Sequence, residues 1–202
     1  MNKLFFSFVL LSLCVSCTAQ AQDIQLPAPQ KTGGKPLMEA FNDRQSNRNF
    51  SSKDLSLQTI ADLAWAAYGL NRENKRTVPS SQDRQEIDLY ISLQSGIYFY
   101  EAKENKLILK VSGNHQAMTG KQPFVTTAPL NFIFVANLDK ASNRDAALTD
   151  CGFISQNIYL FCASEGLITV VRGSYDKDGL HKLLTLNDKQ EVLLTQTVGY
   201  QQ

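Results

Sequence analysis

Apolar residues recur along the chain at two spacings, and each spacing predicts a kind of secondary structure. In Ile87–Leu93, apolar and polar residues alternate, which is typical of a strand with one buried face. The run Asn131–Asn137 is mostly apolar and is typical of a central strand covered on both faces. The strands expected from these patterns and from the turns between them span 87–93, 97–100, 107–111, 131–137, 167–171 and 191–198.

The helical spacing of apolar residues predicts four helices. Ser56 is a good N-cap, apolar residues follow it at intervals of three and four, and Gly69 stands where that helix should end. The strongest signal covers Ala146–Glu165, which is apolar around much of its girth and is therefore expected to be buried. The expected helices span 36–41, 57–68, 146–165 and about 179–184. Because strands and helices mix without regular β-α-β alternation, the predicted fold class is α+β.

The N-terminus has the pattern of an export signal. A short positive start precedes the apolar run Leu4–Val15, and Ala19–Ala21 is a small-x-small cleavage site, so residues 1–21 are predicted to be a signal peptide. The alternative is a lipoprotein signal in which Cys17 becomes lipidated. The protein is therefore expected to be periplasmic or lipid-anchored in the cell envelope, with membrane contact only if Cys17 carries lipid. Residues 22–36 are expected to form an extended spacer, and 37–202 a single domain.

Charge and cysteine content exclude several classes of function. Loss of Lys3 with the signal leaves 19 basic and 19 acidic residues, so no basic excess points to nucleic acid. Cys151 and Cys162 are eleven residues apart in one predicted helix, about 16 Å along its axis, which is too far for a disulfide. They are expected to be small buried residues, and no Cys/His cluster predicts a metal site.

The stretch Asp43–Phe50 carries the most suggestive chemistry. It sets the guanidiniums of Arg44 and Arg48 four residues apart, with the hydroxyl of Ser46 midway. Guanidinium forks bind phosphate bidentately, and a hydroxyl adds a further donor to the same anion. The simpler alternative is a pair of solvated surface arginines.

A second stretch, Pro79-Ser80-Ser81, lies in a segment without periodic apolar residues. The proline fixes a backbone angle, and the two serines place hydroxyl and N–H groups close together. An ordinary turn accounts for this pattern equally well.

Four blocks in order resemble the nitroreductase family of FMN-dependent oxidoreductases. They are Arg44–Phe50, Leu63–Arg72, Arg76–Ser81 and Cys151–Asn157, and Val198-Gly199-Tyr200 is similar to the last strand of the family. The resemblance covers roughly residues 37–200. It implies a mixed sheet packed by helices and an entwined homodimer with FMN at the interface.

The resemblance also assigns roles to residues. Arg44 and Ser46 would hold the FMN phosphate, and Arg48 would approach the pyrimidine edge of the ring. Pro79, Ser80 and Ser81 would line the cofactor, and the loop at Arg172, Gly173 and Ser174 would lie near the reactive side of the ring. Asp83 stands where the family usually has Asn, and an ionised acid cannot donate a hydrogen bond. Gln201 and Gln202 stand where many members place basic residues that complete the phosphate site.

The activity that the resemblance implies is ping-pong transfer of hydride or electrons from a small-molecule donor to a small-molecule acceptor. The acceptor is unknown, with nitroaromatic or quinone-like compounds plausible, and no catalytic acid or base is expected. Arg76–Ser80 also resembles the azoline-oxidising branch of the family, which is one alternative. The other is a degenerate, non-catalytic binding or envelope protein, which Asp83 and the ending at Gln202 favour.

Overall fold

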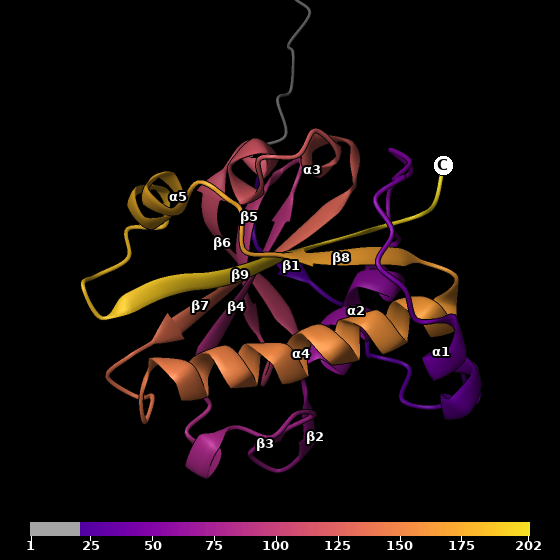
Figure 1. Cartoon of the computed structure of the whole chain (residues 1–202), viewed down its shortest axis with the longest axis horizontal. Helices are drawn as coiled ribbons and strands as arrows, with labels where there is room; N and C mark the ends of the chain where they lie inside the picture. Colours follow the sequence, from indigo (N-terminus) through magenta and orange to yellow (C-terminus); the bar gives the residue numbers. More distant parts are fainter. Residues whose placement is uncertain (1–20) are drawn as a thin grey trace, which may run out of the picture.

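The computed structural model describes residues 21–202 and confirms the α+β class (Figure 1). Its strands are β1 (Ile24–Gln25), β2 (Leu70–Arg72), β3 (Lys75–Arg76), β4 (Ile87–Leu93), β5 (Gly96–Glu101), β6 (Lys106–Ser112), β7 (Leu130–Asn137), β8 (Ile168–Arg172) and β9 (Gln190–Gly199). Its α-helices are α1 (Leu37–Asp43), α2 (Leu57–Tyr68), α3 (Phe124–Thr127), α4 (Arg144–Glu165) and α5 (Lys177–Leu183). Two 3-10 turns are η1 (Ser81–Asp83) and η2 (Gln116–Thr119). The predicted signal segment lies outside the described residues, apart from Ala21.

Seven strands form one sheet in the order β1-β6-β5-β4-β7-β9-β8, and every pairing between them is antiparallel. β7 is an interior strand, with β4 on one side and β9 on the other. Seven of its eight residues are buried, which confirms the prediction from its apolar run. Within residues 21–202, the parallel pairing that a mixed sheet implies is therefore limited to an isolated bridge from Ser46 to Thr169 of β8.

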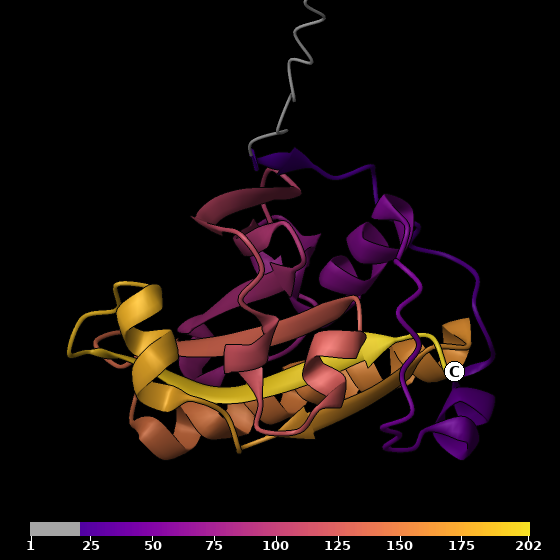
Figure 2. The same ribbon diagram turned by 90° about the horizontal axis from the view of Figure 1, so that it is seen from above.

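One face of the sheet is covered by α2 and α4, and α4 runs along β9 (Figure 2). The Asn143 side chain caps α4 by accepting a hydrogen bond from the Ala146 N–H at 2.8 Å. Gly166 ends the helix at φ 69°, a conformation that favours glycine. Between helix and sheet, Phe132, Phe134 and Ile154 have no exposed surface, so this layer is the main hydrophobic core.

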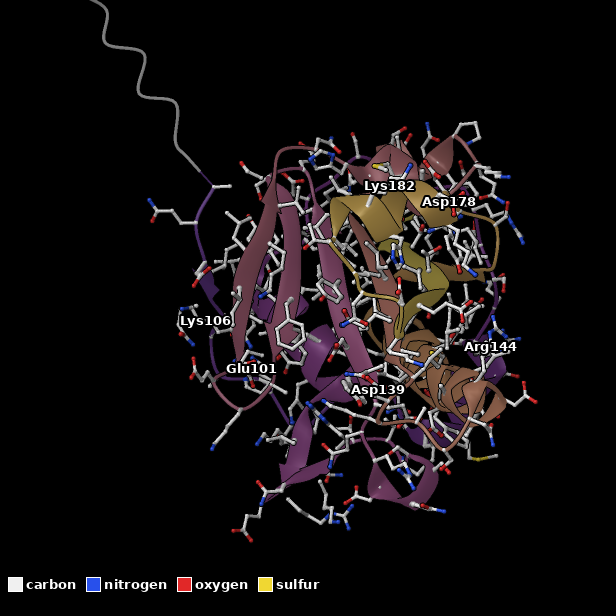
Figure 3. All side chains as sticks on the ribbon, turned by 90° about the vertical axis from the view of Figure 1, so that its left-hand side faces the viewer. Glu101, Lys106, Asp139, Arg144, Asp178 and Lys182 are labelled. Atoms are coloured by element: carbon white, nitrogen blue, oxygen red, sulfur yellow. The ribbon has the colours of Figure 1, made fainter. Side chains whose placement is uncertain are left out.

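The opposite face carries α5, η2 and α3. Leu180 of α5 is fully buried in a cluster with Ile133 and Val135 of β7. Asp178 and Lys182 flank it in sequence on the same helix and face solvent (Figure 3). The sheet is therefore covered on both faces, as the two-sided burial of β7 requires.

The expected helices and strands are confirmed, with boundaries shifted by up to about two residues. Six short elements were not predicted: β1, the two strands of the β2–β3 hairpin, η1, η2 and α3. Cys151 and Cys162 are buried free thiols, as expected. None of the described helices is long and apolar enough to cross a membrane.

Residues 22–36, for which an extended spacer is expected, run along the domain surface. β1 pairs with β6, the Gln30 N–H donates to Asp62 of α2 at 2.7 Å, and the Lys35 N–H donates to Ser164 of α4 at 2.9 Å. Leu26 is 3% exposed. This segment therefore links the β6 edge of the sheet to both helices of the main core.

Candidate functional site

The Arg44–Phe50 segment lies between α1 and the end of the sheet. The Arg44 N–H caps α1 by donating to the Ala40 carbonyl at 3.0 Å. The chain then extends along β8, where the Asn47 N–H donates to the Thr169 carbonyl at 3.1 Å. These backbone bonds fix the direction of the segment and place its side chains over the C-terminal part of α4.

Tyr159 of α4 joins the residues of this segment. Its hydroxyl lies 2.8 Å from the Ser46 hydroxyl and accepts a hydrogen bond from the Val171 N–H at 3.1 Å. The Arg44 guanidinium lies over the Tyr159 ring, 5.5 Å from its centroid. Arg44 and Ser46 are thus oriented by the same aromatic side chain, which sequence reasoning did not single out.

Arg44 lines a cavity of about 480 Å³ between α1, α4 and β8. Its other lining residues are Lys35, Asn42, Asp43, Gln45, Tyr159, Cys162, Ala163, Gly166, Leu167, Ile168 and Gln201. Lys35 is paired with Asp43 at 2.7 Å, and this hydrogen bond raises the pKa of Lys35. Among the described residues, neither Arg44 nor Arg48 forms an ion pair with a carboxylate. Arg44 is therefore available to bind an anion in this cavity.

Gln201, which stands where many members of the resembling family are expected to place a basic residue, lines the same cavity. Its side-chain carbonyl accepts a hydrogen bond from Asn47 at 3.4 Å, and the Gln202 N–H donates to the Asn49 carbonyl at 3.0 Å. The Gln201 side chain therefore forms part of the cavity wall without contributing a charge.

Pro79 and Ser80 line a different cavity of about 380 Å³ beside the β2–β3 hairpin. The Ser80 hydroxyl accepts a hydrogen bond from the Gln85 N–H at 3.0 Å. The Thr77 hydroxyl is buried at this cavity with no hydrogen-bond partner among residues 21–202. An unpartnered hydroxyl there is a polar group that a ligand can satisfy.

Ser81 and Asp83 continue this loop in η1. The Ser81 N–H donates to the Asp150 carboxylate of α4 at 2.8 Å. Asp83 has a positive φ of 56° and is ion-paired with Lys75, and this hydrogen bond lowers the pKa of Asp83. Its carboxylate is thus already used by the hairpin, and it offers no donor in place of the usual Asn.

The Arg172 side chain points into the protein interior and is 6% exposed. It donates to the Thr119 carbonyl at 3.1 Å, to Asn131 at 3.1 Å and to the Thr197 hydroxyl at 2.6 Å. Burial lowers the pKa of Arg172 to about 10. The following loop exposes Gly173 and Ser174, so any cofactor contact there would come from the loop backbone or from the Ser174 hydroxyl rather than from the Arg172 side chain.

The predicted site residues form two separate groups on one chain. The cavity that Arg44 lines includes none of Pro79–Asp83, and the cavity that Pro79 and Ser80 line includes none of Arg44–Arg48. The groups contact α4 at Tyr159 and Asp150, nine residues apart, which is about 13 Å along the helix axis. The described chain therefore holds two half-sites rather than one closed pocket.

Solved structures with the same fold define the class of protein. A nitroreductase-type protein from Ralstonia eutropha JMP134 superposes with a TM-score of 0.84 at 36% identity, over 91% of each chain. A chain of the Escherichia coli microcin synthetase McbBCD complex shares the fold with a TM-score of 0.67 at 18% identity, covering 98% of this chain and 84% of that one. This shared fold identifies an oxidoreductase of the flavin type.

The chain belongs to the nitroreductase family, whose sequence pattern matches residues 42–200. A nitroreductase-type protein of Methanocaldococcus jannaschii is 27% identical over 194 residues, which is 88% of this chain and 96% of that protein. The resemblance inferred from the four sequence blocks is thereby confirmed.

Proposed function

We propose that the protein is an FMN-dependent oxidoreductase that passes hydride or electrons from a small-molecule donor to a small-molecule acceptor in a ping-pong cycle. The observation that carries this proposal is the placement of Arg44. Its guanidinium lines a polar cavity, has no carboxylate partner among residues 21–202, and lies beside a hydroxyl, Ser46, that Tyr159 orients. A phosphate monoester is the group that such a donor set recognises.

The residues present fit FMN in two places. Arg44 and Ser46 would hold the phosphate, and Arg48, which is exposed and has no carboxylate partner among the described residues, would face the pyrimidine edge of the ring. When bound, FMN supplies the two-electron chemistry, and the protein supplies position and electrostatics. Cationic charge from Arg48 would favour added negative charge at that edge.

A homodimer would bring the two half-sites together. The outward face of α4 exposes Leu148 (38%) and Phe153 (41%), and α1 exposes Met38 (75%). Because α4 contacts both half-sites and exposes apolar side chains, we expect a second copy of the chain to pack against this helix. In that arrangement Pro79–Ser81 of one subunit would complete the site begun by Arg44 of the other.

The acceptor is proposed as a nitroaromatic or quinone-like compound, because planar conjugated molecules can stack on a flavin ring and take two electrons from it. No described side chain is assigned as an acid or base in this step. The donor must be available in the cell envelope if the predicted export holds. Fractionation of cells that express the full chain tests that prediction, and recovery in the cytoplasm would contradict it.

The decisive experiment is a visible absorption spectrum of residues 22–202 purified in excess FMN and passed over a gel-filtration column. Flavin absorbance that co-elutes with a species of dimer size is the expected result. Turnover is then tested with reduced nicotinamide, and separately with dithionite-reduced enzyme and a quinone. A colourless protein would overturn the proposal and favour the non-catalytic alternative.

The azoline-oxidising alternative rests on Arg76–Ser80, and the structure gives Arg76 a different role. Its guanidinium donates to the Tyr68 carbonyl at 3.0 Å and to Gln85 at 3.1 Å, and it stacks on the Tyr68 ring. These contacts hold the β2–β3 hairpin against α2. Because the motif is explained by packing, we rank this activity below the general oxidoreductase.

A further inference from the structure

Glu86, the residue before β4, is a fully buried acid without a counter-ion. It has no exposed surface, and no other described residue donates a hydrogen bond to either carboxyl oxygen. Its polar neighbour is the carboxyl of Asp150 on α4, which is 4% exposed and lies within hydrogen-bonding reach. Two ionised carboxylates in this position would repel each other in a medium that solvates neither.

Arg84 is the cation that faces Glu86, and its charge lowers the pKa of Glu86 less than burial and Asp150 raise it. Arg84 is exposed, and its guanidinium is bound to the side chain of Gln82 and the carbonyl of Lys140. Burial raises the pKa of the Tyr68 hydroxyl on α2 and of the Cys151 thiol on α4, so both are neutral. The low-energy arrangement is therefore a protonated Glu86 that donates to the Asp150 carboxylate. Burial is the main cause that raises the pKa of Glu86; its own backbone N–H lowers the pKa in part, and the Asp150 carboxyl raises it further.

Asp150 connects this proton to the η1 loop. The Asp150 carboxylate also accepts a hydrogen bond from the Ser81 N–H at 2.8 Å. The loop beyond Ser81 holds Gln82, Asp83 and Gln85 at positive φ values of 53°, 56° and 49°. Non-glycine residues in that region are strained, so the loop keeps this shape only while its surroundings hold it.

We propose that Glu86 is a positioning residue: its protonated carboxyl donates a hydrogen bond that holds the Asp150 side chain in place. Asp150 in turn holds the Pro79–Asp83 loop against α4. Loss of the Glu86 proton leaves two adjacent carboxylates, and the loop is then released from α4. The expectation that release of this loop weakens FMN binding rests on the proposed function. The release itself does not depend on that function.

The pH dependence has a definite sign. Because the pKa of Glu86 is raised in the folded protein, its contribution to stability is fully present below pH 4.5, the unfolded value, and is lost as pH rises through the raised pKa. One proton is released on unfolding within that window. The unfolding equilibrium constant should therefore rise by up to about tenfold per pH unit relative to a variant without this group.

The test compares wild type with Glu86→Gln, Asp150→Asn and Asp150→Ala, all without flavin. Glutamine at 86 donates permanently to Asp150, so the pH slope of the unfolding constant between pH 5 and 8 should be lower than in wild type. Asparagine at 150 can still accept from Ser81 and donate to Glu86, so it should keep the loop in place. The exposed Asp139→Asn is the matched control and should keep the wild-type slope. Groups such as Asp88, whose pKa burial also raises, contribute equally to each protein and cancel.

Hydrogen exchange at the Ser81 amide reports the loop directly. In Asp150→Ala we expect exchange at least about tenfold faster than in wild type, because one charge-assisted hydrogen bond is lost. In Asp150→Asn we expect exchange within about twofold of wild type. An unchanged pH slope in Glu86→Gln, or unchanged exchange in Asp150→Ala, overturns the proposal. If Asp150→Ala does not fold, the contrast between wild type and Asp150→Asn in the pH slope decides the same question.

FMN titration of the same variants is a separate readout. Weaker binding in wild type above the pKa of Glu86, but not in Glu86→Gln, is expected. If wild type binds no FMN at all, the proposed function fails, while the unfolding and exchange data still decide the role of Glu86.

Discussion

Ser46 and Tyr159 are 113 residues apart in the chain, yet their side-chain oxygens lie 2.8 Å apart. This hydrogen bond holds the Arg44–Phe50 segment against α4. The Tyr159 hydroxyl also accepts the Val171 N–H, so it joins three segments around one cavity. It is the contact on which the geometry of the proposed phosphate site depends most.

Tyr159→Phe should lower the free energy of unfolding by about 1–3 kcal/mol, because the Val171 N–H loses its partner in a partly buried position. It should also weaken FMN binding, since Ser46 loses its orientation. Urea unfolding and flavin titration measure the two effects. Tyr175→Phe is the matched control: it removes a hydroxyl that donates to the Val192 carbonyl at 2.6 Å, away from the cavity. If both variants bind FMN like wild type, Tyr159 has no part in the site.

Arg44→Ala should weaken FMN binding by about tenfold or more, because one charge-assisted contact to phosphate contributes about 1.5–3 kcal/mol. Stability should change little, as Arg44 has no carboxylate partner among the described residues. Flavin titration by fluorescence measures the affinity. Lys103→Ala, the same charge change in the exposed β5–β6 turn, should leave it unchanged. Equal affinities for both variants would move the phosphate site elsewhere.

Phe153→Asp should convert the protein to a monomer if α4 forms the dimer interface, because an ionised side chain is costly in an apolar contact. Sedimentation velocity measures the mass. Leu57→Asp, a charge at a 49% exposed apolar position of α2, serves as the comparison and should remain dimeric. A dimeric Phe153→Asp would exclude this face of α4 as the contact.

Glu191 gives a prediction for acid stability. Its hydrogen bond with Arg144, and then that with Lys177, lower the pKa of Glu191. Such a group stabilises the fold above its unfolded pKa, and this contribution is lost as pH falls through the lowered value. Glu191→Gln should cost about 1 kcal/mol or less at pH 7, because both partners are more than half exposed and solvent screens them. The difference from wild type should vanish in strong acid, and Glu73→Gln, in the exposed β2–β3 turn, is the matched control. Thermal unfolding at several pH values measures both.

The sequence predicted those parts of the fold whose packing imposes a period. The alternation in β4 identified a strand, but the single buried face expected for it is wrong, because Tyr90 and Ser92 on its other face are 8% and 0% exposed. α4 is long enough for its apolar pattern to be recognised. β1 has only two residues, and the β2–β3 hairpin is polar, so neither carries a periodic signal. Short elements of this kind are fixed by contacts with distant residues.

The site was predictable only in part, for the same reason. Arg44, Ser46 and Arg48 are close in sequence and form a recognisable motif. Tyr159 was hidden because a tyrosine in an apolar helix is equally typical of the core. Glu86 is adjacent to a strand and would ordinarily be solvated. Its burial beside Asp150 brings together two residues 64 positions apart, which no local pattern describes.

The pairing of β1 with β6 sets the length of any tether to a membrane. If Cys17 carries a lipid, seven residue steps separate it from Ile24, where the sheet begins, and a fully extended chain covers at most about 25 Å in that distance. A tether reaching to α1 at Leu37 would have allowed about 70 Å. A lipidated form would therefore be held close to the bilayer by the β6 side of the sheet, and its reach toward envelope partners would be short.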